Sequence, residues 1–348
     1  MGSAEARQPA LPQRKTRVSP ADAKKFAVSV LVGNGLSESD AATVAHCLVA
    51  ADLRGIDTHG INRLPSYMTR IRKGLNDPKA IPIVNQVTPV VAQVDGGNAF
   101  GFIGAKVGMT RAIEMAQSYG IGMQALDANM LSLVFTNSSP ALPAWGGREK
   151  LMGVSPIACG APGDHPFILD MAPSVAARGK IYKALRRGES IPTDWALDGD
   201  GAFTDNPRAA LEGVMLPMGG PKGSALAIMM DVFSGVLSGS AFAGHVTGPY
   251  DFSKPADVGH FLVAIKPDLF MGTTEFRSRM EYLYQRVVGS RKMAGVDRIY
   301  FPGEIEQLHQ TERETNGIPF VEAEIAALNE EAKIVGAVTL VVESWDLQ

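Results

Sequence analysis

The most diagnostic stretch of the chain, residues 52–65, reads DLRGIDTHGINRLP. In a helical turn, His59 and Arg63 are four residues apart and would face the same side. Histidine exchanges a proton near neutral pH, and arginine can hold a carboxylate through two parallel hydrogen bonds. The alternative is a surface histidine that caps the turn, with Arg63 in a salt bridge to Asp57 or Asp52. The spacing alone favours neither interpretation.

Two helices are predicted on the N-terminal side of this stretch. Ser19 and Pro20 form a typical helix start, an N-cap serine followed by a proline, and open a helix over residues 21–32. Ser37 opens a second helix, in which apolar residues recur at helical spacing as far as Gly55. A pair of helices is therefore expected to lead into the diagnostic stretch.

The composition is that of a globular protein without a strong field of either sign. The 348 residues are 45% apolar, Lys and Arg (33) nearly balance Asp and Glu (36), and the net charge is −3. Such a balance offers no broad positive surface to a polyanion, so nucleic acid is not an expected partner. Cys47 and Cys159 are too few for a zinc site or a disulfide framework. We therefore expect no metal site and a reducing, cytoplasmic location.

The chain contains no pattern typical of a signal peptide or a membrane anchor. Residues 1–18 are polar and partly basic, without an apolar run of signal-peptide length, so a flexible arm is expected there. Ala6 stands where a myristoylation motif needs Ser or Thr. The longest apolar stretch, Ser224–Val236, is too short to span a membrane and contains Asp231. No membrane partner is expected.

The rest of the chain alternates between strand-like and helix-like patterns, which predicts an α/β protein. Apolar runs broken by glycine and proline predict strands at residues 90–95, 131–137, 153–160, 167–171 and 261–267, and a closing strand at 338–342. Helices are predicted at residues 105–118, 174–187, 222–237, 274–291 and 316–329.

Two connections next to these elements have the composition of ligand-binding loops. Residues 217–224 read PMGGPKGS and place Lys222 at the start of an apolar helix, where backbone N–H groups, the helix dipole and an ammonium all attract an anion. The alternative is a solvated lysine in the first turn of a core helix. Asp170 and Ser174 lie between a strand and a helix, where ligand contacts are common, although Ser174 can equally be a plain cap.

The glycine loop at residues 96–104, GGNAFGFIG, follows a short predicted strand. Its glycine spacing does not fit the G-x-G-x-x-G pattern of a Rossmann dinucleotide site, and no acidic residue completes that pattern. We therefore interpret the loop as a structural turn.

Several of these segments occur together, and in the same order, in one protein family. The chain resembles the type-2 malate/L-lactate dehydrogenase family, which includes ureidoglycolate dehydrogenase, sulfolactate dehydrogenase, diketogulonate reductase and the piperideine-2-carboxylate reductases. The resemblance extends from about residue 20 to about residue 340. It is carried by residues 54–60 with Arg63 and Tyr67, residues 146–150, Asp170-Met171 with Ser174 and Gly179-Lys180, Ile191-Pro192 with Trp195-Ala196, and residues 216–223.

The resemblance implies an enzyme that transfers a hydride between NAD or NADP and a small 2-oxo or 2-hydroxy acid or a cyclic 2-imino acid. It also implies a cofactor domain with a mixed sheet and no Rossmann fold, and a homodimer in which each active site is close to the partner subunit. His59 would donate the proton, and Arg63 and Thr58 would bind the substrate. The cofactor would contact Ile168, Leu169, Asp170, Met171, Ala172, Pro173, Ser174, Lys222, Gly223, Gly303, Glu304 and Ile305.

The same resemblance suggests how the chain is divided. After the arm at residues 1–18, residues 19–90 would form a helical region that contributes to the active site. Residues 91–270 would form the α/β domain that binds cofactor and substrate. Residues 271–348 would supply helices and a strand that pack back on the N-terminal region.

The sequence departs from the family pattern in two places. After residues 119–122, family members continue into a strand, an Asn-His-Phe-Gly-type motif and a further helix, which residues 123–129 replace here. The absent segment includes a histidine that some members use as the catalytic base. The family's Gly-Thr-Asn-Pro stands here as Gly153-Val154-Ser155-Pro156. Either His59 alone suffices for acid–base catalysis, or the chain is a diverged member that acts as a binding protein or as a non-redox enzyme for cyclisation or isomerisation.

Overall fold

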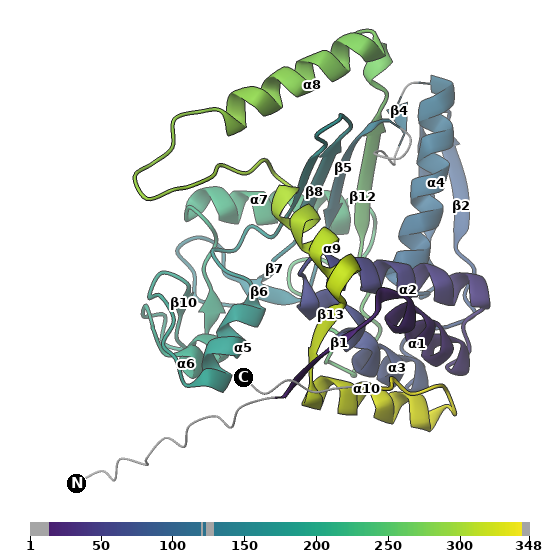
Figure 1. Ribbon diagram of the computed structural model, residues 1–348, viewed down its shortest axis with the longest axis vertical. Helices are drawn as coiled ribbons and strands as arrows, with labels where there is room; N and C mark the ends of the chain where they lie inside the picture. The colour runs from purple at the N-terminus through teal and green to yellow at the C-terminus, as the bar shows by residue number, and fades with distance from the viewer. Residues whose placement is uncertain (1–13, 120, 123–128, 343–348) are drawn as a thin grey trace.

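The computed structural model describes residues 14–119, 121–122 and 129–342, and it combines helices with sheets as expected (Figure 1). Its α-helices are α1 (Pro20–Gly33), α2 (Glu38–Leu53), α3 (Leu64–Arg72), α4 (Gly101–Tyr119), α5 (Arg178–Arg187), α6 (Pro207–Glu212), α7 (Pro221–Asp231), α8 (Thr273–Val288), α9 (Glu304–Asn316) and α10 (Glu322–Ile334). Shorter helical turns are η1 (Asp57–His59), η2 (Ile61–Arg63), the π-helical η3 (Val232–Val236) and η4 (Pro267–Leu269).

The strands fall into one large sheet and several small ones. They are β1 (Lys15–Val18), β2 (Ile83–Thr88), β3 (Val91–Asp95), β4 (Ile121–Gly122), β5 (Leu131–Thr136), β6 (Pro140–Leu142), β7 (Met152–Gly153), β8 (Ile157–Ala161), β9 (Phe167–Met171), β10 (Ala196–Leu197), β11 (Val214–Met215), β12 (His260–Ile265) and β13 (Ile318–Val321). The large sheet has the order β4-β12-β5-β8-β9.

Every pairing between the described strands of this sheet is antiparallel. The expectation of a mixed sheet is corrected in this respect by the observed registers. For β8 and β9 the reason is local, because a connection as short as residues 162–166 can join only antiparallel neighbours. A Rossmann sheet consists of parallel strands joined by crossover helices. The absence of a Rossmann fold from the described residues is thus confirmed.

The two N-terminal helices begin where their capping residues predict. The Ser19 hydroxyl accepts a hydrogen bond of 3.0 Å from the Asp22 N–H, and the Ser37 hydroxyl accepts one of 3.1 Å from the Asp40 N–H. Both helices bury an apolar face in the larger hydrophobic core, which also receives side chains from α3, β13 and α10. This core supports the diagnostic stretch, because it includes Ile61.

Two expected elements in the middle of the chain are shorter than predicted. The strand expected at residues 153–160 is split into β7 and β8 by Ser155, whose φ is +34°. The helix expected from Ser174 begins only at Arg178, because Ser174 pairs with Pro217 in an extended conformation.

The C-terminal part of the chain corrects three expectations. Instead of one helix at residues 316–329, α9 ends at Asn316, Gly317 turns the chain with φ +84°, and β13 follows. Part of the expected arm, β1, pairs antiparallel with β13 and buries Thr16 and Val18, while residues 1–13 lie outside the described residues. Residues 338–342 form no strand, although the Leu340 N–H donates a 2.7 Å hydrogen bond to the Asn329 side chain.

The C-terminal helices pack against the N-terminal helices. Helix α9 contacts α2, and α10 contacts α1 and α3, so the last helices pack on the first (Figure 1). Helix α8 lies at the other end of the molecule and contains no buried residue. None of the described helices is long and apolar enough to cross a membrane.

Candidate active site

Two tight helical turns carry the residues that the sequence singled out. After α2, Gly55 adopts φ +82°, and η1 and η2 then lead into α3. Gly60 is extended and separates the two turns. His59 and Arg63 therefore come from successive 3-10 turns rather than from one helical turn, and the Arg63 N–H donates a 3.0 Å hydrogen bond to the Gly60 carbonyl.

Asp52, in the last turn of α2, lies directly beneath these turns. Its side chain is fully buried, and Oδ2 accepts a 2.9 Å hydrogen bond from the Ile61 N–H. A Cβ on Gly60 would lie 1.6 Å from Asp52 Oδ1, so only glycine fits there. Burial raises the pKa of Asp52 to about 7, and the hydrogen bond from Ile61 opposes this rise. The carboxyl group thus anchors the backbone between His59 and Arg63.

His59 ends η1, and its ring reaches solvent at the surface of the molecule. Its Nδ1 lies 2.9 Å from the Thr58 hydroxyl, in a hydrogen bond whose direction depends on the tautomer. Partial burial of the ring disfavours its charged form and so lowers the pKa of His59, and the positive charge of Arg63 acts in the same direction. Because Nδ1 is engaged, Nε2 is the nitrogen that can exchange a proton with a ligand.

Arg63 has only uncharged partners in the described part of the chain. Its Nε donates a 2.6 Å hydrogen bond to the Thr58 carbonyl, and its Nη1 donates one of 3.1 Å to the Tyr250 hydroxyl. No carboxylate within residues 14–119, 121–122 and 129–342 forms a salt bridge with it. The guanidinium therefore remains available to an anion.

The carboxylates near Arg63 have other partners, which excludes the salt bridge considered for this segment. Arg313, on α9, donates hydrogen bonds to the Asp57 carboxylate and to the Asp52 carbonyl. The alternative of a salt bridge from Arg63 to Asp57 or Asp52 is therefore wrong. An unpaired guanidinium close to an imidazole suits an anionic ligand that exchanges a proton.

The three segments expected to contact the cofactor lie together around β9. At the start of this strand, a Cβ on Gly303 would lie 2.7 Å from Ile168 Cβ. Beyond its end, the Met218 N–H donates a 2.9 Å hydrogen bond to the Pro173 carbonyl, and a Cβ on Gly223 would lie 2.9 Å from the same oxygen. The fold thus brings together three segments that are far apart in the sequence.

Helix α5, which follows β9 in the chain, packs against the turn that carries His59. A Cβ on Gly179, in α5, would lie 2.9 Å from Thr58 Cγ2. Thr58, which is expected to bind substrate, therefore contacts the helix that follows β9 in the chain. Burial raises the pKa of Asp170, on β9, and the positive charge of Arg54 partly opposes this effect.

The start of α7 carries one exposed basic side chain and no acidic one. Gly220 precedes the helix without a side-chain cap, and the first turn has no acidic residue. Lys222 is exposed at this end. The helix dipole and the Lys222 ammonium attract an anion here. The N–H groups of Gly220, Lys222 and Gly223, in contrast, already donate hydrogen bonds to the carbonyls of Pro217, Gly219 and Met218.

A pocket that is open to solvent lies at the start of α9. It measures about 300 Å³ and is lined by Tyr300, Ile305, Leu308 and His309. Of these residues, only Ile305 was expected in the site. The others belong to a polar, amphipathic stretch without a local signal, and the fold places them beside Gly55, whose Cβ would lie 3.1 Å from His309 Cδ2. Glu304, also expected here, accepts hydrogen bonds from Arg298 and the Phe301 N–H.

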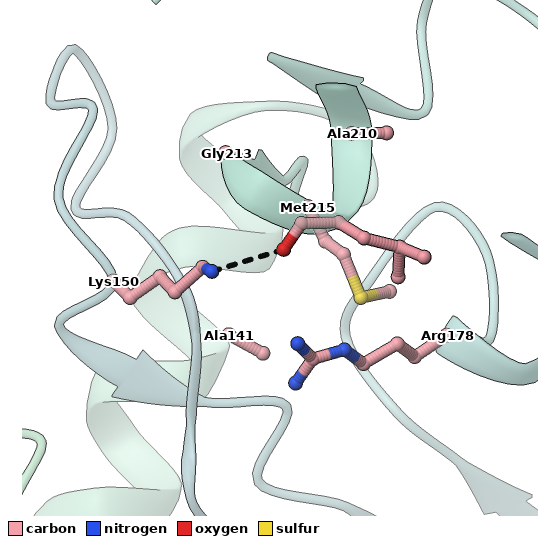
Figure 2. A pocket seen from close by; sticks show the side chains of 7 residues that line it. Ala141, Lys150, Arg178, Ala210, Gly213 and Met215 are labelled. Carbon is pink, nitrogen blue, oxygen red and sulfur yellow. Dashed lines mark hydrogen bonds between the residues drawn. The ribbon is translucent and has the colours of Figure 1, made fainter. Parts of the chain in front are cut away.

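A second, smaller cavity contains two basic side chains, Lys150 and Arg178 (Figure 2). The Lys150 ammonium donates hydrogen bonds of 3.1 and 3.2 Å to the carbonyls of Leu211 and Glu212. Burial lowers the pKa of Lys150, and the charge of Arg178 acts in the same direction. Lys150 therefore serves to hold the end of α6.

Of the two departures from the family pattern, the structure describes residues 153–156 but not residues 123–128. Ser155 is fully buried, its N–H donates a 3.3 Å hydrogen bond to the Ser138 hydroxyl, and its own hydroxyl has no partner in the part of the chain that the structure describes.

Comparison with known proteins places this geometry in a family. The sequence pattern of the family described as Malate/L-lactate dehydrogenase matches residues 18–127 and 122–329. The two matched segments meet where the sequence departs from the family.

Three similar proteins are dehydrogenases or reductases. L-sulfolactate dehydrogenase from Methanocaldococcus jannaschii is 35% identical over 314 residues, which cover 85% of this chain and 91% of that protein. Ureidoglycolate dehydrogenase (NAD(+)) from Escherichia coli K12 is 34% identical, with coverages of 83% and 88%. Delta(1)-pyrroline-2-carboxylate reductase from Ancylobacter novellus is 33% identical, with coverages of 90% and 96%.

The solved structure of sulfolactate dehydrogenase from Methanocaldococcus jannaschii has the same fold. It matches with a TM-score of 0.87 and 33% identity over 92% of this chain and 98% of that one. The expected type-2 fold is thereby confirmed. The chain belongs to the malate/L-lactate dehydrogenase family and is an oxidoreductase.

Proposed function

We propose that this enzyme transfers a hydride between a nicotinamide cofactor, NAD or NADP, and a small 2-oxo acid, 2-hydroxy acid or cyclic 2-imino acid. The observation that carries the proposal is the guanidinium of Arg63, which lacks a carboxylate partner in the described chain and lies near His59. The three relatives are named after reactions of sulfolactate, ureidoglycolate and pyrroline-2-carboxylate, all of them carboxylic acids. All three names denote redox enzymes, so nothing favours the non-redox alternative.

Arg63 would hold the substrate carboxylate. Its Nε and one Nη1 hydrogen are used by Thr58 and Tyr250, which leaves three of the five N–H groups for a ligand. A carboxylate fixed in this way keeps the neighbouring carbon in one position relative to His59, as a reactive geometry requires.

His59 would move the proton. When bound, the reduced nicotinamide supplies the hydride to the carbonyl or imine carbon. His59 Nε2 gives a proton to the developing alkoxide or amine, and it takes that proton back when a hydroxy acid is oxidised. Because the pKa of His59 is lowered, the neutral form dominates at pH 7 in the free enzyme. Oxidation therefore needs a pH above this pKa, and reduction a pH below it.

The cofactor would be held by residues 168–174, by Lys222 and Gly223 at the start of α7, and by residues 303–305. Two observations support this assignment. The start of α7 has no side-chain cap or acidic first turn, and Ile305 lines the cavity of about 300 Å³. Thr58 would contact the substrate from the same side as Arg63.

A homodimer in the cytoplasm is part of the same proposal. Its support is that α8 contains no buried residue, as is expected of a helix that a second subunit covers. The free state of Cys47 and Cys159 agrees with a reducing compartment.

The first prediction concerns His59. We expect the wild-type protein to bind NADH or NADPH and to consume it with a panel of small 2-oxo and cyclic imino acids. His59→Ala should lower kcat by about 10²- to 10⁴-fold, the usual contribution of a general acid, with the cofactor affinity nearly unchanged. Fluorescence titration measures cofactor binding, and the absorbance of the reduced nicotinamide measures turnover.

His46→Ala, a change to a histidine on α2, serves as the matched control. Turnover retained in His59→Ala would remove His59 from its role. Failure of the wild-type protein to bind either cofactor at millimolar concentration would contradict the proposal. A cofactor that binds but is never consumed would favour the non-redox alternative.

A further inference from the structure

The loop at residues 248–254 is tied to α3 by a buried arginine. Arg70, only 3% exposed, donates hydrogen bonds of 3.2, 2.7 and 3.2 Å to the carbonyls of Gly248, Asp251 and Lys254. Three carbonyls spread over the loop therefore converge on one guanidinium. The path of the loop over α3 is fixed at both ends and in the middle.

Tyr250, in this loop, contacts Arg63 at the start of α3. Arg63 immediately precedes α3, and its Nη1 donates the 3.1 Å hydrogen bond to the hydroxyl of Tyr250. The Arg63 Cζ atom lies 5.5 Å from the centre of the Tyr250 ring. Tyr250 is 67% exposed, so burial in a core does not explain its position. What holds the ring is its contact with the guanidinium.

Arg63 and Tyr250 both keep hydrogen-bond donors that have no acceptor among the described residues. The Tyr250 hydroxyl accepts from Arg63, and in residues 14–119, 121–122 and 129–342 it has no acceptor for its own hydrogen. Arg63 retains three N–H groups on its two terminal nitrogens. A phenol and a guanidinium side by side, both with free donors, form a site for an oxyanion.

A second phenol lies close to the same point. Tyr67, on α3, follows Arg63 by four residues, which is about one helical turn. Burial raises the pKa of Tyr67, and the charge of Arg63 opposes this effect. Tyr67 is fixed by an edge-on contact with Phe100, with the ring centres 5.7 Å apart. The oxyanion site is thus built from α3 on one side and from the loop on the other.

We propose that Tyr250 is a specificity-determining residue, which holds the Arg63 guanidinium in place and donates its own O–H to the carboxylate of the substrate. The inference rests on the proposed function, because it assigns the substrate carboxylate to Arg63. This inference adds Tyr250 to the substrate-binding residues. The loop at residues 248–254 would then form one wall of the substrate site.

The test measures the binding of an unreactive carboxylate, so that it does not depend on turnover. Wild type, Tyr250→Phe and Tyr250→Ala are titrated calorimetrically with oxamate, an analogue of small 2-oxo acids, in the presence and in the absence of NADH. Tyr250→Phe keeps the ring beside Arg63 and removes only the hydroxyl. We expect the Kd for oxamate to rise about tenfold, as for a lost hydrogen bond to a charged group.

Three further measurements separate this role from a structural one. The Kd for NADH and the thermal midpoint should stay unchanged in Tyr250→Phe, because the ring is exposed. Tyr282→Phe, a change to an exposed tyrosine on α8, should leave oxamate binding unchanged. In an Arg63→Gln background, Tyr250→Phe should weaken oxamate binding less than in the wild type, since the two side chains act together.

The outcomes distinguish the inference from the proposed function. An unchanged Kd for oxamate in Tyr250→Phe overturns the inference. A wild-type protein that binds oxamate but reduces no 2-oxo or imino acid overturns the proposed reaction, and the Tyr250 variants still decide the inference. A wild-type protein that binds no oxamate overturns the inference, even if it consumes NADH with another substrate.

Discussion

Asp52 lies beneath the turn that carries His59, and it is both buried and only partly hydrogen-bonded. Oδ2 accepts from the Ile61 N–H, whereas Oδ1 has no partner among the described residues. Burial raises the pKa of Asp52 to about 7, well above the usual value of about 3.9 for an aspartic acid. The folded protein therefore keeps a proton that the unfolded chain releases between about pH 4 and pH 7.

The raised pKa of Asp52 gives the second prediction, which concerns how stability depends on pH. The contribution of Asp52 to stability is complete below about pH 4 and is lost as the pH rises to about 7, a change on the order of 4 kcal/mol. Asp52→Asn cannot titrate. We expect the free energy of unfolding of the wild type to fall relative to that of the variant across this range, as measured by urea denaturation at several pH values.

The comparison isolates one group, because all other titrating groups are common to both proteins. Asp164→Asn, a change to an exposed aspartate, controls for the loss of a carboxyl group. If the wild-type and Asp52→Asn curves run parallel from pH 4 to pH 7, Asp52 does not hold its proton in the folded state.

Single residues also show which parts of the site a sequence can reveal. His59 and Arg63 lie within one short segment, so their residue types alone suggest a proton donor next to an anion ligand. Tyr250 is 187 positions from Arg63, and Arg313 is 256 positions from Asp57. No local pattern connects residues at such separations, and only the folded chain shows that they touch.

Elements were predictable where their signals are local. The starts of α1 and α2 follow from Ser19 and Ser37, whose hydroxyls accept the hydrogen bonds that define a cap. The segment at residues 316–329 misled us because its apolar residues also fit a helix. Its first part is a strand only because β1, about 300 residues earlier, is there to pair with it.

Gly317 gives the third prediction, at the scale of an element. It joins α9 to β13 with φ +84° and ψ 161°, a conformation that is essentially restricted to glycine. A Cβ would also lie 3.1 Å from the Val18 carbonyl oxygen. Gly317→Ala should therefore lower the free energy of unfolding by about 1–3 kcal/mol, measured by urea denaturation.

Gly272→Ala is the matched control for this change. Gly272 precedes α8 with φ −56°, and a Cβ there meets nothing within 4 Å. We expect this substitution to be neutral. Equal stabilities of the two variants would show that the junction between α9 and β13 tolerates a side chain.

At the scale of the whole molecule, the site lies between two hydrophobic cores. Ile61 belongs to the core formed by the first and last helices, whereas Ile181, in α5, belongs to a second core. Thr58, which precedes Ile61 in the chain, touches Gly179, which precedes Ile181 in α5. Ligand sites occur preferentially at such junctions between packed units.

The fourth prediction, which belongs to the scale of the whole molecule, is that the protein is a dimer. Helix α8 contains no buried residue, and Leu283 on it is 49% exposed. We expect light scattering to give twice the mass of the chain for the wild type. Leu283→Asp should shift the mass toward that of the monomer, because a charge would be buried against the partner.

Ile334→Asp is the matched control, since Ile334 is 58% exposed at the end of α10. It should leave the mass unchanged. A monomeric wild type would contradict the dimer, and a dimer that persists in Leu283→Asp would move the interface away from α8.

The anchoring of the loop at residues 248–254 has a consequence for how this enzyme can diverge. Arg70 grips the loop only through main-chain oxygens, which every amino acid supplies. The side chains at positions 248, 251 and 254 can therefore change without loss of these hydrogen bonds. Tyr250 differs from them, because its own hydroxyl and ring make the contact with Arg63. The main chain thus sets the course of the loop, and a single side chain sets its contact with the guanidinium.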